Sequence, residues 1–310
     1  MTNRTHRTRS PQQGDHGSLL ADGSGISHSV PARSGPIVVK VGGAPLEDPA
    51  VAPALLEAIA DLHLEHDGGV ALVHGGGRAV DRQLEKLGMV TERREGIRIT
   101  PPEQLDQIVG VLAGIMNKRL MGEFLRLNIG AVGLCLGDAD AVPTRKAAGF
   151  SFDPGRVGEP IPMEPGRGVD RTNLFSTLLR ERFLPVISSI GIDFQGQFLN
   201  VNADDAAAGV AQTVGASALV LLTDVPGVLD GGKRVIPELD RARIDALIAS
   251  GVIAGGMVPK VKAAAEVAAR SGVPVVIMAA AGGSELVQLA RMSGAGASGG
   301  PHPGTRILPG

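Results

Sequence analysis

The chain has 310 residues, a formal net charge of −2 and an aromatic content of 2%, with no Trp or Tyr. This charge gives no electrostatic basis for binding nucleic acid or a membrane surface, and so few aromatic residues argue against base-stacking platforms. The single cysteine, Cys135, rules out an internal disulfide and argues for a reducing, cytoplasmic compartment. The core must come from Val, Leu, Ile and Ala, which is typical of a buried parallel sheet.

Residues 1–35 are rich in Ser, Gly, Arg, His and Gln and contain no sustained apolar run. We expect a disordered tail here, because such a segment cannot bury enough apolar surface to offset the entropy of ordering. The missing apolar run also argues against a secretory signal peptide, and no run in the chain reaches transmembrane length. Residues 294–304 are expected to form a second, Gly-rich loop.

The most informative feature is a pair of glycine clusters, each lying between an apolar run and a segment with helical periodicity. Lys40-Val-Gly42-Gly43 follows the run 37–39, and His74-Gly75-Gly76-Gly77 follows the run 70–73. A glycine-rich turn between strand and helix lets backbone N–H groups point at an anion, and the helix N-terminus adds partial positive charge. The two turns and Lys40 therefore predict a device that holds a transferable phosphate.

Helices are expected after both clusters. The first has its apolar face at Leu55, Ile59 and Leu62, and Gly68-Gly69 is expected to cap its C-terminus. A short helix over 79–87 follows the second cluster.

The next segment, 90–100, alternates in character around Glu95-Gly96 and predicts a hairpin. Pro101-Pro102 then opens a long helix that runs to about Arg126. Its apolar side is expected to hold Leu105, Ile108, Leu112, Ile115 and Met116.

Further apolar runs at 130–136, 184–190, 218–222 and 273–278 are expected to be buried strands. Strands that alternate with helices predict an α/β fold with a mainly parallel sheet between helices.

Asn200-Val-Asn202-Ala-Asp204-Asp205 precedes an Ala-rich segment with helical character. Asn202, with Asp205 three residues on, fits a helix N-cap. A cap does not explain Asn200 and Asp204 together. A carboxylate beside two amides could orient catalytic lysines or a metal-bound phosphate.

Residues 223–229, Thr-Asp-Val-Pro-Gly-Val-Leu, directly follow the run that ends at Leu222. They fit either a Pro-Gly turn or a nucleotide-contacting loop at the carboxyl end of a parallel strand. Gly255-Gly256-Met257-Val258-Pro259-Lys260 begins another helix. A cation in the first turn is disfavoured by the helix dipole, which favours an anionic ligand for Lys260.

In this order the motifs resemble the amino-acid kinase family, and within it the branch that acts on N-acetyl-L-glutamate. The resemblance covers about residues 36–310 and rests on the segments 40–43, 73–77, 96–100, 130–134, 184–189, 200–204, 223–229 and 255–260. It implies an open, mainly parallel sheet of about eight strands between helices. An amino-acid-binding and dimerisation half would span 36–195, and an ATP-binding half 196–310.

The resemblance implies transfer of the γ-phosphoryl group of ATP, which carries Mg²⁺, to the side-chain carboxylate of N-acetyl-L-glutamate in arginine biosynthesis. Lys40 and Lys260 would flank the transferring group, and Asp204 would hold both lysines in place. Arg98 would pair with the substrate α-carboxylate, and Asn200, Gly76 and Gly77 would contact the same substrate. The phosphate and nucleotide site would be lined by Gly42, Gly43, Gly75, Thr223, Asp224, Val225, Gly227, Val228, Leu229, Gly255, Gly256 and Met257.

No general base is needed, because a carboxylate nucleophile is already ionised near pH 7. His74 is therefore expected to be a packed or loop-bonding residue. Arg98 could alternatively be an exposed hairpin arginine.

Two other functions remain open. One is a sister kinase acting on N-acetyl-aminoadipate or another acidic substrate; the other is a non-catalytic regulator, which the presence of both lysines and Asp204 disfavours. Arginine-inhibited members of the family carry an N-terminal helix that links dimers into hexamers. Pro11, Pro31 and many Gly and Ser do not support such a helix here, so we expect an arginine-insensitive homodimer built through the long helix after Pro101.

Overall fold

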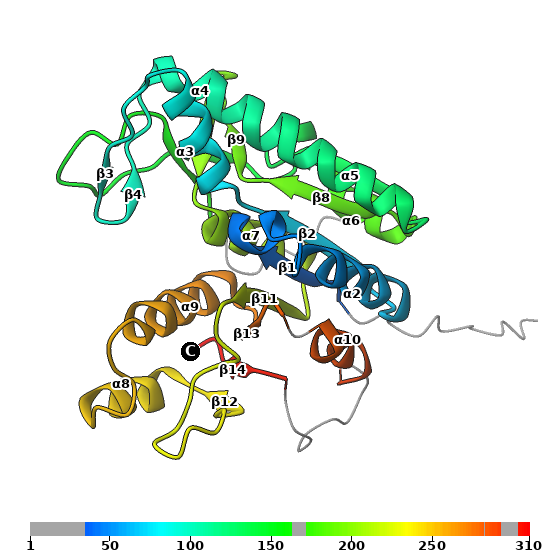
Figure 1. Cartoon of the computed structure of the whole chain (residues 1–310), viewed down its shortest axis with the longest axis vertical. Helices are drawn as coiled ribbons and strands as arrows, with labels where there is room; N and C mark the ends of the chain where they lie inside the picture. The colour runs from blue at the N-terminus through cyan, green and yellow to red at the C-terminus, as the bar shows by residue number, and fades with distance from the viewer. Residues whose placement is uncertain (1–34, 163–171, 282, 293–302) are drawn as a thin grey trace, which may run out of the picture. The chain divides into compact units, whose positions relative to one another are not determined.

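The computed structural model describes residues 35–162, 172–281, 283–292 and 303–310 (Figure 1). The chain divides into the units 1–32 and 33–310, and all described residues belong to the second. The tail expected at 1–35 therefore lies, except for Gly35, outside the described residues, as does most of the loop expected at 294–304.

A large sheet runs through the described part of the chain with the strand order β12-β14-β13-β11-β1-β2-β8-β5. Neighbouring strands in this sheet pair in parallel, except that β13 and β14 pair antiparallel. The prediction of a mainly parallel sheet of about eight strands is confirmed. The strands are β1 (Ile37–Val41), β2 (Val70–His74), β5 (Ala131–Cys135), β8 (Leu184–Ser188), β11 (Ala218–Thr223), β12 (Glu238–Leu239), β13 (Val275–Ala279) and β14 (Thr305–Ile307).

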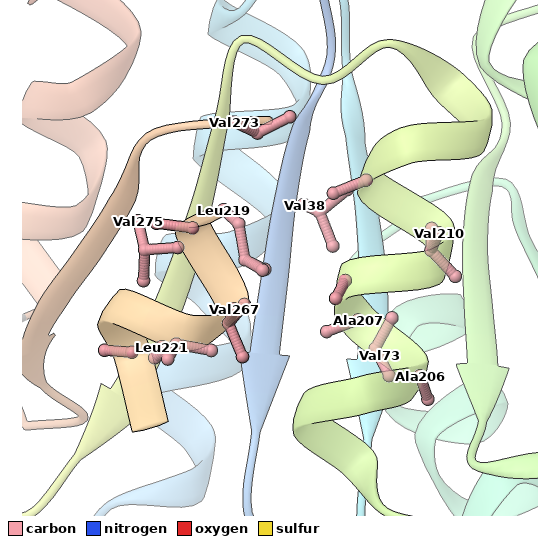
Figure 2. Packing of buried hydrophobic residues seen from close by; sticks show 14 of the residues in the cluster. Val38, Val73, Ala206, Ala207, Val210, Leu219, Leu221, Val267, Val273 and Val275 are labelled. Atoms are coloured by element: carbon pink, nitrogen blue, oxygen red, sulfur yellow. The ribbon is translucent and has the colours of Figure 1, made fainter. Parts of the chain in front are cut away.

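Helices cover both faces of this sheet. One face packs against α2 (Ala52–Glu65), α5 (Asn117–Arg126) and α10 (Gly283–Met292). The other packs against α6 (Leu174–Arg180), α7 (Ala203–Val214), α8 (Arg241–Ala249) and α9 (Met257–Ser271). Strand residues alternate between the two faces, so Val38 and Val73 meet α7 (Figure 2), whereas Val39 and Leu72 meet α2.

A smaller sheet has the strand order β6-β7-β10-β9. Its strands are β6 (Thr144–Lys146), β7 (Val157–Pro160), β9 (Ile190–Ile192) and β10 (Phe198–Val201). The sequence patterns did not predict it, because its strands are too short to show a period. It pairs Asn200 of β10 with Val157 of β7.

The hairpin predicted at 90–100 is confirmed: β3 (Arg93–Arg94) pairs antiparallel with β4 (Ile97–Arg98). Glu95 and Gly96, at the turn, have φ angles of 50° and 80°. Positive φ at both turn residues matches the twist of a two-residue hairpin loop.

The remaining helices are α1 (Gly43–Glu47), α3 (Gly77–Lys86), α4 (Pro102–Val109) and the 3₁₀ turn η2 (Asp138–Asp140). A π-helical segment, η1 (Gly110–Met116), joins α4 to α5, so the long helix predicted after Pro101 is present. Ile115, expected on its apolar side, is 49% exposed, whereas Leu112 and Met116 are buried. The wider π turn changes which residues face the core, and a strict 3.6-residue period misplaces Ile115.

Two other local predictions were wrong. Helix α2 ends at Glu65, before Gly68-Gly69, because His66 adopts an extended conformation; the positive φ of 72° at Gly69 serves the next turn instead. Strand β5 was expected to be buried, but residues 131–134 are partly exposed. The reason is its place at the end of the sheet, where in the described residues it pairs only with β8.

Candidate active site

The carboxyl ends of β1, β2 and β11 share one edge of the large sheet, since Val41 pairs with both His74 and Leu222 in parallel register. Helices α7 and α9 each lead directly into a strand of the same sheet, β11 and β13. Both helices must therefore begin at the carboxyl edge. In α/β sheets, ligands bind at this edge.

The two glycine turns after β1 and β2 touch each other there. A Cβ on Gly43 would lie 2.9 Å from the Cα of Gly76, and a Cβ on Gly76 would lie 2.2 Å from the Met116 Sδ. Gly76 has an ordinary extended φ of 174°, so close approach rather than backbone conformation requires glycine. The Gly75 N–H donates to the Val41 carbonyl at 3.0 Å, which ties the second turn to the end of β1.

Lys40 forms an ion pair with Asp204, its Nζ lying 2.9 Å from the Asp204 Oδ1. Strand alternation turns Lys40 toward α7, and Asp204 lies in the first turn of that helix. Asn202 is the N-cap, and its Oδ1 accepts the Asp204 N–H at 2.8 Å, which confirms the predicted cap. Asp205 does not complete a capping box; it pairs with Arg270 of α9.

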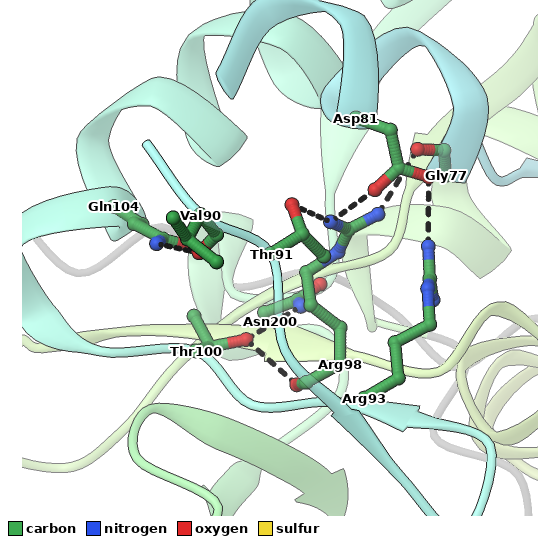
Figure 3. Close-up of polar contacts among 9 residues, drawn as sticks. All are labelled: Gly77, Asp81, Val90, Thr91, Arg93, Arg98, Thr100, Gln104 and Asn200. Atoms are coloured by element: carbon green, nitrogen blue, oxygen red, sulfur yellow. Dashed lines mark hydrogen bonds and ion pairs between the residues drawn. The ribbon is translucent and has the colours of Figure 1, made fainter. Parts of the chain in front are cut away.

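Arg98 is buried, with 7% of its side chain exposed, so the interpretation as an exposed hairpin arginine is wrong. Its Nη1 donates to the Asp81 Oδ1 at 2.5 Å and the Thr91 Oγ1 at 3.2 Å, and its Nη2 donates to the Gly77 carbonyl at 3.0 Å (Figure 3). Partial burial alone would raise the pKa of Asp81, but Arg98, with help from Arg93, outweighs it and holds that pKa below its usual value. The guanidinium is thus held rigidly on α3.

A cavity of about 340 Å³ opens beside these groups. It brings together nine of the residues singled out in the sequence: Lys40, Gly42, Gly43, Gly75, Gly76, Gly77, Arg98, Asn200 and Asp204. Part of its wall is apolar and includes Val80, Ile108, Leu112, Phe150 and Val157. The cavity therefore combines an ammonium, a guanidinium, an amide and glycine turns with room for an apolar segment, which suits a small anionic ligand.

Gly42, Gly43 and Gly75 line this cavity, but the other residues assigned to the nucleotide do not. Those residues lie at the end of β11, in the loop after it and at the start of α9. Lys260 pairs with Asp224, not with Asp204, and this hydrogen bond holds the pKa of Asp224 below its usual value. Thr223 closes the turn by bonding Val225 through its Oγ1. Asp204 thus contacts one of the two predicted lysines, and Asp224 contacts the other.

The rest of this loop is fixed from within. The Val228 side chain is buried in the core, its N–H donates to the Thr305 Oγ1 at 2.7 Å and its carbonyl accepts from Ile236. Gly227 and Gly255 have positive φ angles of 149° and 57°. Met257 packs partly against the core, and Gly256 is the N-cap of α9.

Several cavity residues were missed in the sequence. Ser189 follows β8, and its place after a parallel strand could have identified it. Glu159, which pairs with Arg145 at 2.9 Å, comes from the unpredicted small sheet and gave no signal. Asp81 and Thr91 accept hydrogen bonds from Arg98, and no local sequence pattern predicts these contacts.

His74 is fully buried, and burial lowers its pKa to about 4. The neutral ring accepts a hydrogen bond from Asn117 at its Nε2 and bonds the Gly75 carbonyl through its Nδ1. The expectation of a packed, loop-bonding residue is confirmed.

Residues 35–279 match the amino acid kinase family, and the chain belongs to that family. It is 39% identical to the acetylglutamate kinase of Proteus mirabilis over 242 residues. The aligned region covers 78% of this chain and 90% of that protein. The acetylglutamate kinase of Pectobacterium atrosepticum is 41% identical over the same shares of both chains. The structure of carbamate kinase from Giardia lamblia shares the fold, with a TM-score of 0.54 at 20% identity, over 89% of this chain and 99% of that one.

Proposed function

We propose that this chain is an acetylglutamate kinase, which transfers the γ-phosphoryl group of ATP to the side-chain carboxylate of N-acetyl-L-glutamate in arginine biosynthesis. The observation that carries the proposal is the Lys40–Asp204 ion pair beside two touching glycine turns, opening on the cavity that holds Arg98 and Asn200. The relatives that match most of the chain bear the same name.

The reaction needs positioning and charge stabilisation more than proton transfer. A carboxylate oxygen of the substrate attacks the γ-phosphorus, the bond to the β–γ bridging oxygen breaks, and ADP leaves with that electron pair. Lys40 and Lys260 offset charge on the phosphoryl oxygens, and N–H groups of the glycine turns bind them. Asp204 orients Lys40, to which it is paired, and Asp224 orients Lys260.

The amino-acid substrate lies in the cavity. Arg98 binds the α-carboxylate through its Nε–H and its second Nη2 N–H, the two donors that its bonds to Asp81, Thr91 and Gly77 leave. Asp81 holds the guanidinium in place. Asn200 and the backbone of Gly76 and Gly77 contact the same substrate. The apolar wall accommodates the acetyl group and the methylene chain.

The nucleotide lies over the loop 223–229 and the start of α9. This part of the chain offers the Lys260 ammonium and the positive end of the α9 dipole, which together favour a triphosphate. Mg²⁺ carried by the nucleotide would supply further charge neutralisation for the triphosphate beside Lys260. Residues 36–195 are then the amino-acid half and 196–310 the ATP half, and one continuous sheet joins them. Asn200 and Asp204 of the second half complete the amino-acid cavity.

The working unit is a cytoplasmic homodimer that arginine does not inhibit. Two observations support the dimer: in the described residues β5 pairs only with β8, and the apolar side chains of Ile115 and Leu125 in the adjoining helical segments are exposed. In the described residues, no helix is long and apolar enough to span a membrane.

An ATP-dependent hydroxamate assay tests the proposal, because hydroxylamine traps an acyl phosphate. The substrates are N-acetylglutamate, glutamate, aspartate and N-acetyl-aminoadipate. We expect the highest kcat/KM with N-acetylglutamate. A preference for N-acetyl-aminoadipate would make the chain a sister kinase, and absence of product with all four would favour a non-catalytic regulator.

A further inference from the structure

We infer that Thr100 is a positioning residue, whose hydroxyl fixes the orientation of the Asn200 amide so that the cavity presents a hydrogen-bond acceptor to the substrate N–H. The inference rests on the proposed function. Thr100 is fully buried at the end of the hairpin and does not line the cavity, so it acts through Asn200.

The hydrogen bonds of Thr100 determine the orientation. Its hydroxyl carries one proton, which it donates to the Arg98 carbonyl at 3.1 Å. Toward Asn200 it can therefore only accept, and the group that lies 3.0 Å away is the Asn200 Nδ2. The Asn200 Oδ1 must point the other way, and among the described residues no hydrogen bond reaches it (Figure 3).

The backbone around both residues is held in register. The Thr100 N–H donates to the Pro154 carbonyl at 3.0 Å, and the Asn200 N–H donates to the Arg156 carbonyl at 2.9 Å. One segment, 154–157, thus holds both backbones. A Cβ on Gly155, which has a φ of 71°, would lie 2.1 Å from the Thr100 carbonyl oxygen, so glycine keeps this contact close.

The result is a donor and an acceptor in the same cavity. Arg98 supplies N–H groups and Asn200 supplies a carbonyl oxygen. An N-acyl amino acid has the complementary pair, a carboxylate and an amide N–H on the same carbon. An ester isostere, with oxygen in place of that N–H, would set two acceptors against each other and leave the Asn200 oxygen unpaired.

The test compares N-acetylglutamate with its ester isostere 2-acetoxyglutarate in the intact chain and in Thr100→Val. The parent should prefer the amide by on the order of tenfold or more in kcat/KM. Thr100→Val frees the Asn200 amide to turn, so KM for N-acetylglutamate should rise roughly tenfold while KM for ATP stays unchanged. The preference for the amide should shrink, because the turned amide can donate to the ester oxygen.

Thr100→Ser restores the hydroxyl and should restore the preference. Thr144→Val is the matched control, because it removes a buried hydroxyl that bonds the Ile192 carbonyl outside the cavity; its preference should equal the parent's. If Thr100→Val does not fold, Thr100→Ala carries the same test.

An unchanged preference in the Thr100 variant, or a Thr100→Ser variant that behaves like Thr100→Val, would overturn the inference. A parent chain that phosphorylates N-acetylglutamate without distinguishing it from the ester would do so as well. A parent inactive with N-acetylglutamate would instead defeat the proposed function, so the two failures are distinguishable.

Discussion

Lys40 and Lys260 come from opposite ends of the chain, and each is paired with a carboxylate at the carboxyl edge of the sheet. We predict that Lys40→Ala and Lys260→Ala each lower kcat by on the order of 10²–10³, because each removes charge stabilisation of the transferring phosphoryl group. Lys262→Ala, at an exposed position of α9, the helix that carries Lys260, is the control and should leave kcat unchanged. Steady-state kinetics decide the matter, and near-normal turnover would remove that lysine from the site.

At Arg98, the geometry of the side chain can be tested separately from its charge. Arg98→Lys keeps a cation but loses the paired fork, so substrate binding should weaken by roughly 1.5–3 kcal/mol, about ten- to a hundredfold in KM for N-acetylglutamate. KM for ATP should hardly move. Arg94→Lys, at an exposed position of the same hairpin, is the control. Equal KM values for Arg98→Lys and the parent would exclude a substrate contact.

The residues of this site differ in how far the sequence predicts them. Lys40 lies near the carboxyl end of β1, the glycine turns follow β1 and β2, and Asp204 lies in the first turn of α7. Because parallel strands end at one edge of a sheet, the meeting of these residues could be foreseen. The pairing of Lys260 with Asp224 in place of Asp204 could not be foreseen, since it depends on how far the side chains reach across this edge. The hold of Asp81 on Arg98 depends likewise on how the hairpin lies on α3.

At the scale of elements, the start of α3 lies directly against the π-helical segment η1. A Cβ on Gly76 would lie 2.2 Å from the Met116 Sδ and 2.7 Å from the Leu112 Cδ2. Gly76→Ala should therefore destabilise the fold by roughly 1–3 kcal/mol, the usual cost of overpacking. Met116→Ala in the same chain should recover part of that loss, a coupling that urea denaturation of both single variants and the double variant can measure.

Gly110→Ala is the matched control within η1. A Cβ there meets nothing within 4 Å and the φ of −57° suits any residue, so its stability should stay equal or rise slightly. Additive effects of Gly76→Ala and Met116→Ala would contradict a direct contact between the turn and the helix.

The elements show where sequence periodicity succeeds and where it fails. The long runs that form β1, β2, β8 and β11 are buried on both faces and were predicted, because a parallel sheet needs continuous apolar strands. β5 carries the same kind of run yet lies at an edge, and strand order is not written in one strand's composition. Ile115 was misplaced because a π turn leaves no mark in the pattern.

At the scale of the whole molecule, the proposed dimer can be tested at Leu125, an exposed apolar side chain of α5. Leu125→Arg places a charge where a second copy would pack, so light scattering should show the mass falling toward that of one chain. Leu64→Arg, at an exposed position of α2, should leave the mass unchanged. Deleting residues 1–34 should also leave it unchanged, and a parent that is already monomeric, or a hexamer that this deletion breaks into dimers, would contradict the proposed assembly.

The pH dependence of folding is a second property of the whole molecule, and it arises from buried histidines. Burial lowers the pKa of His74 to about 4 and also lowers the pKa values of His63 and His66. Between the unfolded value of 6.5 and the folded value, the unfolded chain binds more protons than the folded chain. The part of the folding stability that depends on these neutral histidines is therefore fully present above pH 6.5 and is lost as the pH falls. By pH 4, His74 alone accounts for a loss of roughly 3 kcal/mol.

The pH range over which the buried histidines affect stability differs from that of the paired carboxylates. The pKa values of Asp81 and Asp224 are held below 3.8, so the stability that these groups add is lost only at lower pH. We predict that His74→Gln, whose amide oxygen can still accept from Asn117, flattens the dependence of unfolding free energy on pH between 6.5 and 4. The slope should not vanish, because His63 and His66 still contribute. Urea denaturation at several pH values measures it, and a slope equal to the parent's would mean that His74 takes up its proton in the folded chain as readily as in the unfolded one.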